Sequence, residues 1–239
     1  MLNVAVVGFG NTKFTHADIS IESLLLSATK SLFDQSINLN QKDIDVVLVS
    51  TNDNSKYLSA ILSELAGISP KISHTVESLC NSGTNSTISA FSYLASGLAD
   101  VALVVGADRY DNPGQIFKWD ASRGEFKHPI FWASMFTKAH KRKYGTTEED
   151  LAIVSAKNHK NAQNNPNAYS HKAYSIEEIM NSKALTEDLR LLDCSRPCTG
   201  SSAILLASDA KAKEFTDRPV WIKGIGQKTI SADLQKTVL

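Results

Sequence analysis

Short apolar runs that alternate with amphipathic helical patterns are the feature that most constrains the fold of this chain. The strand-like runs span residues 3–8, 45–50, 72–76 and 100–107, and the helical patterns between them span 20–37, 57–66 and 84–97. The order β-α-β-α-β-α-β requires a mainly parallel sheet with helices on its faces. We therefore predict an α/β fold whose functional site lies at the carboxyl ends of the strands.

The segment between residues 108 and 190 differs in composition from the rest of the chain. It contains three further helical patterns, over residues 131–143, 148–164 and 175–183. An insertion of this length in an α/β chain is usually a lid, a pocket wall or an oligomer contact. The basic residues near 138–143 are most simply a solvated helix face, and a site for a phosphate-bearing cofactor is the alternative. After the insertion, the pattern predicts a strand over 201–207, a helix over 209–214 and a strand over 219–224.

Two glycines close the first strand-like run, in the order Gly8-Phe9-Gly10. A dinucleotide-binding fingerprint requires a third glycine at position 13, where this chain has Lys13. The phosphate cradle of that fingerprint is therefore not formed, and we predict that the two glycines form a turn.

Composition excludes several classes of partner. Twenty-five basic and 25 acidic residues cancel, so we expect neither nucleic acid nor an anionic membrane as a partner. The apolar runs are too short to span a membrane, and the first residues read as a strand rather than a signal peptide. Three cysteines, an odd number, favour a reducing compartment over a disulfide framework. We therefore expect a cytoplasmic protein.

Cys80 is the main candidate for chemistry, because it lies where a strand gives way to a helix. Backbone N–H groups and the macrodipole at a helix N-terminus favour a thiolate over a thiol. The small residues Ser82 and Gly83 allow a substrate carbonyl to approach, and their amides are placed to receive an oxyanion. The alternative is a buried structural cysteine, which is the commoner role for this residue type.

The other candidate residues are less informative. Cys194 and Cys198 have the spacing C-x3-C, but no second pair of cysteines or histidines follows, so we predict no metal site. Six histidines are scattered along the chain, at positions 16, 74, 128, 140, 159 and 171. None is marked by its neighbours as a base for Cys80, although a cysteine nucleophile needs such a partner.

Several motifs in the same order resemble the thiolase superfamily, and within it the archaeal and sterol-carrier-protein-type thiolases. Residues 6–14 are similar to the opening G-x-G-x-T-K-F, and residues 76–83 to the nucleophile segment V-x-x-x-C-x-S/T-G. Residues 143–152 and 158–166 resemble the loop-domain pattern, and residues 193–203 stand where relatives carry D-C-x-P-x-x-D-G-A-A. The similarity runs from residue 1 to about residue 225.

The resemblance implies a fold and a reaction. Residues 1–239 would form a thiolase amino-terminal half, βαβαβαββ, with residues 108–190 as the loop-domain insertion and the carboxyl-terminal domain absent. Cys80 would attack an acyl-CoA thioester to form an acyl-enzyme, for Claisen condensation or for thiolysis of a 3-ketoacyl-CoA. Coenzyme A would be part of the substrate, and no resident cofactor is expected. Family members are homodimers or tetramers, which implies a homo-oligomer.

The chain also departs from the family pattern, and this leaves two interpretations open. The family's activating histidine, in G-H-P-x-G, and its second cysteine, in C-x-G, belong to the carboxyl-terminal half, and we identify no counterpart of either. Thr199 replaces the usual Asp, and Ser201-Ser202 the usual small apolar pair. The chain is then either an acyl-accepting half that needs a complementing half, or a non-catalytic thiolase-like module. Such a module would bind a hydroxymethylglutaryl-CoA synthase and a zinc-ribbon acyl-CoA-binding protein. A ketosynthase or chalcone-synthase-like condensing enzyme is a remote third interpretation.

Overall fold

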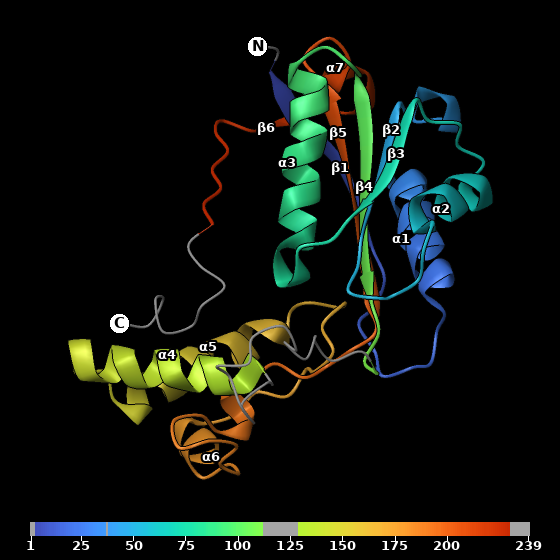
Figure 1. The fold of residues 1–239 in the computed structure, drawn as a ribbon. Coiled ribbons are helices and arrows are strands. Elements are labelled where there is room, and N and C mark those ends of the chain that lie inside the picture. The colour runs from blue at the N-terminus through green and yellow to red at the C-terminus, as the bar shows by residue number, and fades with distance from the viewer. Residues whose placement is uncertain (1–2, 37, 112–128, 230–239) are drawn as a thin grey trace. The chain divides into compact units, whose positions relative to one another are not determined.

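The structure is a computed structural model that describes residues 3–36, 38–111 and 129–229. The chain forms two compact units. The first comprises Met1–Pro113 and Pro197–Gly226, and the second comprises Gly114–Arg196 and Gln227–Leu239. The first unit contains Cys80 and a sheet with helices on both faces, as Figure 1 shows.

Six strands in the described part of the first unit form one sheet. They are β1 (Val4–Asn11), β2 (Val46–Ser50), β3 (Ile72–Val76), β4 (Val101–Asp108), β5 (Gly200–Ser208) and β6 (Val220–Trp221). The helices of this unit are α1 (Ile21–Gln35), α2 (Leu58–Ala66), α3 (Ser82–Ala95) and α7 (Ala212–Phe215), with short 3-10 turns η1 (Gln41–Asp43) and η2 (Leu79–Asn81). The predicted strands and helices are all present, although β6 is only two residues long.

The sheet has the strand order β3-β2-β4-β5-β1-β6. β2 pairs in parallel with β3 and β4, as predicted, whereas β5 lies between β4 and β1 and is antiparallel to both. The predicted α/β fold is confirmed, but the sheet is mixed rather than mainly parallel. Only two of the five pairings are parallel, because β5 inserts between two strands that run in the same direction and β6 adds an antiparallel pairing with β1.

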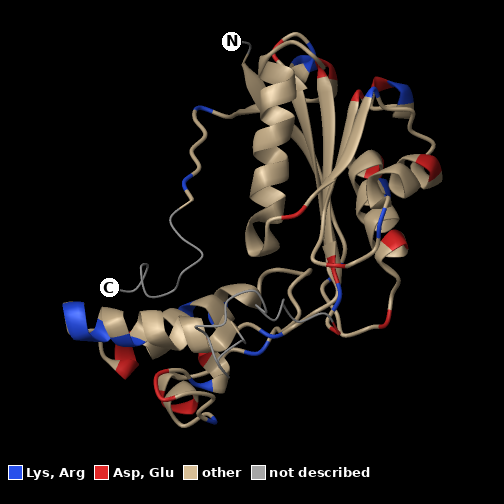
Figure 2. Cartoon of the chain, in the orientation of Figure 1, with Lys and Arg blue, Asp and Glu red and all other residues tan. Residues whose placement is uncertain are grey.

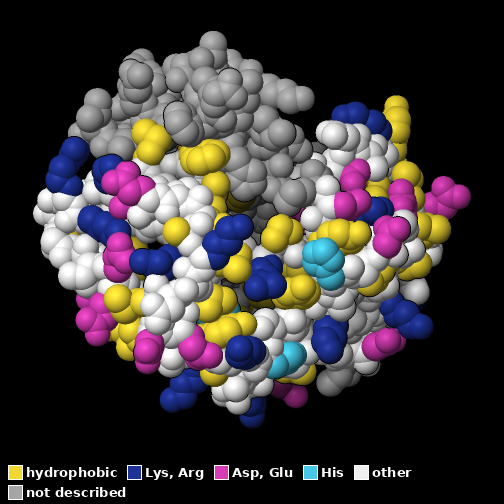
Figure 3. Space-filling view, turned by 90° about the horizontal axis from the view of Figure 1, so that it is seen from below, with side chains coloured by type: hydrophobic (Ala, Val, Ile, Leu, Met, Phe, Trp, Pro, Cys, Tyr) yellow, Lys and Arg dark blue, Asp and Glu magenta, His cyan; other side chains and the backbone are white. Residues whose placement is uncertain are grey.

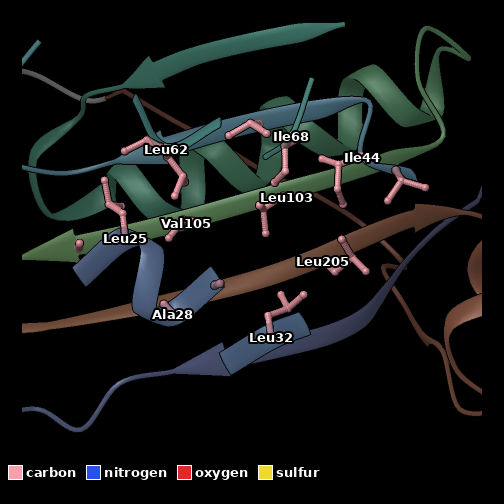
Figure 4. Close-up of a cluster of buried hydrophobic side chains, with 14 of the residues drawn as sticks. Leu25, Ala28, Leu32, Ile44, Leu62, Ile68, Leu103, Val105 and Leu205 are labelled. Atoms are coloured by element: carbon pink, nitrogen blue, oxygen red, sulfur yellow. The ribbon is translucent and has the colours of Figure 1, made fainter. Parts of the chain in front are cut away.

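Two apolar layers hold helices against the two faces of this sheet. α1 and α2 cover one face, where Leu25, Ala28 and Leu32 of α1 pack with Leu103 of β4 and Leu205 of β5 (Figure 4). α3 covers the other face, as Figure 1 shows, through Ala90 and Leu94. Each fully buried leucine contributes about 1.5–3 kcal/mol to folding. The core therefore holds the C-terminal half of α3 against the sheet.

The two glycines of β1 contradict the predicted turn. β1 continues through both of them to Asn11, and its register with β5 shifts between Val6 and Gly8. An ideal Cβ on Gly10 would lie 2.3 Å from the backbone nitrogen of Leu32. Gly10 is therefore required because the backbones of β1 and α1 approach closely. Periodicity along the chain does not reveal such an approach.

The second unit contains helices α4 (Pro129–Tyr144), α5 (Glu148–Ala162) and α6 (Ile176–Met180), and the 3-10 turn η4 (Leu191–Asp193). Thr147 caps the start of α5, because its hydroxyl accepts the N–H of Asp150. Ion pairs link α4 and α5 to residues 187–190: Lys138–Glu187 at 2.8 Å, Lys141–Asp188 at 3.3 Å and Arg190–Glu148 at 2.8 Å. Figure 2 shows a basic end of α4, whereas the strands of the first unit carry few charges.

The surface of the described residues mixes charges of both signs. On the face that Figure 3 presents, acidic and basic side chains are interspersed among apolar ones. Among the described residues, no helix combines the length and the apolar character needed to cross a membrane.

Candidate active site

Cys80 lines an open cleft of about 220 Å³ in the first unit. The cleft lies where β2 and β4 end and β5 begins, which is the edge of the sheet predicted to carry the site. Its lining residues come from these strand ends, from the turn before α3 and from the segment after β1: Phe14, Ser50, Thr51, Asn52, Leu79, Cys80, Ser82, Gly83, Gly106, Ala107, Asp108, Gly200, Ser201 and Ser202. The Cys80 side chain is exposed, so it is not the buried structural cysteine of the alternative interpretation.

The turn that carries Cys80 is held by short hydrogen bonds. Leu79 has φ 50°, in the left-handed region, which costs about 1–2 kcal/mol for a residue with a Cβ. The Glu77 carboxylate accepts the N–H of Leu79 at 2.7 Å. The Ser82 hydroxyl accepts the N–H of Ser78 at 2.7 Å and donates to the carbonyl of Leu79 at 2.7 Å. These bonds keep the strained turn in place and hold Cys80 at the rim of the cleft.

A second set of hydrogen bonds fixes the N-terminus of α3 to β2. The hydroxyls of Ser50 and Ser86 lie 2.6 Å apart, and both side chains are buried. The Ser50 hydroxyl also lies 3.4 Å from the carbonyl oxygen of Ser82. The position of Cys80 relative to the sheet therefore depends on a hydroxyl from the end of β2.

One predicted oxyanion donor is wrong. The backbone N–H of Ser82 donates to the carbonyl of Leu79 and closes the 3-10 turn. Because that amide already has an acceptor within the chain, it is not available to an oxyanion in the cleft. Gly83, the other predicted contributor, does line the cleft.

Asp108, at the end of β4, is a cleft residue that the sequence reasoning missed. Its carboxylate accepts the N–H of Asn52 at 3.0 Å, and the hydroxyl of Thr51 lies 3.4 Å away. Burial raises the pKa of the Asp108 carboxyl, and the nearby Asp53 adds to this, although the two hydrogen bonds partly offset it. An acidic residue directly after a buried strand of a parallel pair was the signal that was available in the sequence.

The described lining of the cleft contains no histidine. His16 stacks on Tyr110 with ring centroids 4.0 Å apart, and the Nε2 atom of His74 lies 3.2 Å from the hydroxyl of Tyr93. His140, His159 and His171 belong to the second unit, and His128 lies outside the described residues. The described lining of the cleft therefore identifies no histidine as a base for Cys80.

The other two cysteines differ from Cys80. Both are half-buried, and burial raises the pKa of each thiol. Cys198 precedes Gly200 with the spacing C-x-G, but it does not line the Cys80 cleft. Among the described residues, no group of three or more His, Cys, Asp or Glu side chains is arranged to hold a metal ion. That the protein binds no metal ion stays a prediction.

Thr199, which departs from the family pattern, has a structural role. Its hydroxyl accepts the N–H of Tyr110 at 3.1 Å. Its backbone N–H and carbonyl pair with those of Thr15 at 2.8 and 2.9 Å. A threonine here therefore joins the residues after β1 and β4 to the start of β5.

Comparisons with known proteins agree with this geometry. The family model "Thiolase, N-terminal domain" matches residues 4–192. An acetyl-CoA acetyltransferase of Methanothermobacter thermautotrophicus is 31% identical over 95% of the chain and 62% of its own length. Sterol carrier protein 2 of Bos taurus is 27% identical over 95% of the chain and 46% of its own length.

A solved structure, the Ltp2-ChsH2(DUF35) aldolase, superposes with a TM-score of 0.80 at 24% identity, over 91% of this chain and 58% of that one. This likeness shows the fold. The chain spans about three fifths of the length of the acetyltransferase that it matches. The match to the family model extends over most of the chain, through strands β1 to β4, Cys80 and the helices of the second unit, and it ends before β5. This chain belongs to the thiolase family, through its N-terminal domain.

Proposed function

We propose that this chain is the acyl-accepting part of a thiolase-type acyl-CoA C-acyltransferase, with Cys80 as the nucleophile. The observation that carries the proposal is an exposed thiol in the turn that leads into α3, at the strand-end cleft of a thiolase N-terminal domain. The relatives named as acetyl-CoA acetyltransferases support an acyl-CoA substrate. Membership of the family supports the reaction class, while the role of Cys80 rests on its position.

In the proposed first step, the Cys80 sulfur attacks the carbonyl carbon of an acyl-CoA thioester. The Cys80 thiol loses its proton as the new carbon–sulfur bond forms, and the bond from that carbon to the sulfur of coenzyme A breaks. Coenzyme A leaves as a thiol, with a proton in place of the one that Cys80 lost. Cys80 lies in the turn that leads into α3, so the negative charge that develops in this step lies near the N-terminus of a helix. The protein requires no resident cofactor for this step, because coenzyme A enters and leaves with the substrate.

In the proposed second step, a second acyl-CoA loses the proton next to its carbonyl. The resulting carbanion attacks the acyl-enzyme carbonyl, and Cys80 leaves as a thiolate, which yields a 3-ketoacyl-CoA. The reverse sequence is thiolysis. The described cleft offers no histidine for the proton transfer, so we propose that a complementing carboxyl-terminal half supplies the base.

Intact-mass analysis after incubation with acetyl-CoA tests the first step. We expect one acetyl group on the wild-type chain, located at Cys80 by peptide mapping, and none on Cys80→Ala. Cys194→Ala is the matched control and should acetylate normally. The measurement is made with and without a complementing thiolase carboxyl-terminal half. If the reconstituted protein carries no acetyl group that depends on Cys80, the chain is not the acyl-accepting part of such an enzyme.

The isolated chain is expected to perform no full condensation cycle. The alternative function is that of a non-catalytic subunit, which the absence of a histidine from the described cleft lining favours. The similar solved structure is named Ltp2-ChsH2(DUF35) aldolase, and that name supports the proposal that this chain also binds a partner protein. We propose a zinc-ribbon acyl-CoA-binding protein and a hydroxymethylglutaryl-CoA synthase as partners. A pull-down from native extract that recovers neither protein would count against this alternative.

We also propose that the chain forms a homo-oligomer and acts in the cytoplasm. β3 lies at one edge of the sheet and pairs only with β2 among the described strands, so one side of it is available to another strand. Sedimentation at micromolar concentration tests the oligomer, and a purely monomeric chain would contradict it. The three cysteines are all free, which suits a reducing compartment.

A further inference from the structure

β3 forms one edge of the sheet and lacks the features that usually protect such an edge. It pairs only with β2 among the described strands. Edge strands commonly carry a lysine, a proline or a bulge, which discourage pairing with another chain. Residues Ile72–Val76 contain no lysine, arginine, aspartate, glutamate or proline, and their register with β2 is regular. The outer side of β3 is therefore suited to pairing with another strand.

The backbone groups of β3 that face outward can be assigned from its pairing with β2. The N–H of Ile72 donates to the carbonyl of Asp45 at 3.1 Å, on the side of β2. N–H and C=O groups alternate between the two sides of a strand, so those of Ser73 and Thr75 face away from β2. Both residues are exposed. Their backbone groups are therefore placed to form hydrogen bonds with a strand added at this edge.

Residue types around β3 repeat in reverse order on either side of His74. Antiparallel pairing of two copies about this residue brings together partners of matching type: Ile72 with Val76, Ser73 with Thr75, and Lys71 with Glu77. Apolar, hydroxyl-bearing and oppositely charged pairs of this kind stabilise neighbouring strands. A shift of the register by one residue breaks all of these matches. A second copy of the chain is therefore the partner whose charges complement this edge.

Both charged residues are accessible to such a partner. The Lys71 side chain is 69% exposed, with its Nζ atom 2.8 Å from Oδ1 of Asp45. Glu77 is also exposed, and its carboxylate accepts the N–H of Leu79 at 2.7 Å. An ammonium group has three donors, and a carboxylate has about four acceptor sites. Each group can therefore keep its contact within the chain and bond across the edge as well.

We propose that Lys71 of a second copy bonds to Glu77 and so supports the turn that carries Cys80. The two copies pair antiparallel through β3, in register about His74. Because Glu77 holds the backbone of Leu79 in that turn, each copy stabilises the cysteine turn of the other. The inference rests on the homo-oligomer proposed above, and it assigns the register of the pairing and its contact with the site.

Charge reversal tests the register. Lys71→Glu places two carboxylates opposite one another at both ends of the pairing, and Glu77→Lys places two ammonium groups there. We expect each variant to raise the dissociation constant of the homodimer about tenfold or more in sedimentation velocity. An equimolar mixture of the two variants restores both opposite-charge pairs and should form a one-to-one dimer, identified by native mass spectrometry. Lys30→Glu, at an exposed position of α1, is the matched control and should sediment as wild type.

A cross-link at the centre of the pairing gives an independent test. The N–H of His74 faces β2, so His74 would lie opposite its own counterpart as a non-hydrogen-bonded pair, with Cα atoms about 4.5 Å apart. That distance permits a disulfide, so His74→Cys should cross-link two copies under a mild oxidant, as peptide mapping identifies. Ser73→Cys is the matched control, because each residue 73 would lie diagonal to its counterpart, at about 7–8 Å, beyond the reach of a disulfide.

The iodoacetamide rate at Cys80 measures the link to the site. In a dissociated, isotopically labelled Lys71→Glu chain, we expect this rate to differ from wild type by about twofold or more. Addition of the Glu77→Lys chain should return it to the wild-type value, because Glu77 of the labelled chain then meets a lysine again. A rate that stays at the wild-type value throughout overturns the role of Lys71 at the cysteine turn.

These outcomes separate the inference from the proposed function. A wild-type dimer that neither charge variant weakens overturns the register, and so does a mixture that fails to associate although both variants are folded by circular dichroism. If a charge variant is unfolded, the cross-link decides: Ser73→Cys that cross-links as fast as His74→Cys overturns the register. A monomeric wild-type chain overturns the homo-oligomer as well. Acetylation of Cys80 is measured separately by mass, and its failure concerns the reaction rather than the pairing of β3.

Discussion

Removing the Ser50 hydroxyl tests whether the cleft depends on the contact that anchors α3 to the sheet. Ser50→Ala leaves the Ser86 hydroxyl without the partner that lies 2.6 Å away, in a place where Ser86 is 0% exposed. A buried polar group that loses its partner costs about 1–3 kcal/mol. For a chain of this size, 1 kcal/mol shifts the melting temperature by about 2–4 °C. We therefore expect Ser50→Ala to lower it by about 2–12 °C.

The double variant gives the sharper expectation. Ser50→Ala with Ser86→Ala removes both hydroxyls of the pair, so neither hydroxyl is left without the other. The cost of the pair should therefore be smaller than the sum of the single costs, with a coupling of about 0.5–3 kcal/mol. Ser92→Ala is the matched control on the same helix, because its hydroxyl donates to the carbonyl of Ile88 at an exposed site.

Urea unfolding followed by circular dichroism measures these four variants, and iodoacetamide kinetics report on Cys80 in each. We expect Ser50→Ala to change the alkylation rate at Cys80, because the first turns of α3 lose their anchor on β2. Strictly additive single and double variants, or a Ser50→Ala chain as stable as Ser92→Ala, would refute the reasoning.

Three further expectations concern other parts of the first unit. Gly10→Ala should lower the free energy of unfolding, measured in urea, by about 1–3 kcal/mol or more, because the added Cβ would overlap the backbone of α1. Gly224→Ala is the control, because a Cβ there meets no described atom within 4 Å. Equal losses of stability in the two variants would contradict the close approach of β1 to α1. Burial raises the pKa of Asp45, but Lys71 at 2.8 Å and two backbone N–H groups outweigh this and lower it. Wild type should therefore be more stable than Asp45→Asn near neutral pH, and the difference should vanish as the pH falls through the lowered pKa of Asp45. A difference in stability that is the same at every pH would contradict this prediction. Burial raises the pKa of Asp108, so the melting temperature of Asp108→Asn should rise relative to that of wild type as the pH rises from 4 to 7. A difference in melting temperature that does not change with pH would argue against a buried carboxylate.

The elements of the fold could be predicted because local signals suffice for them. α1 begins where Ser20 caps it and α5 where Thr147 does, as their polar side chains and the apolar periodicity indicate. β2 is buried along its whole length, as a continuous apolar run predicts. The placement of β5 was not predictable in this way, because hydrophobic periodicity carries no information about which strands pair.

Part of the candidate site could also be predicted from the sequence. The position of Cys80 at a strand-to-helix turn follows from the residues on either side of it, and the resemblance to thiolases named it as the nucleophile. The sequence did not show that the backbone N–H of Ser82 donates to the carbonyl of Leu79, because a 3-10 turn before α3 leaves no clear pattern in the sequence. Asp108 was missed because its importance depends on its partners Thr51 and Asn52, which belong to a different strand end.

The order of the strands and helices, the family and the place of Cys80 before α3 could be predicted from the sequence. What surrounds the sulfur depends on how the chain folds, because Ser50, Gly106 and Ser201 reach the cleft from three strands that are distant in the chain. The same holds for Gly10, where a Cβ would overlap the backbone of α1. Hydrogen bonds and packing between strands act across the sheet, whereas the signals read from the sequence act over a few neighbouring residues.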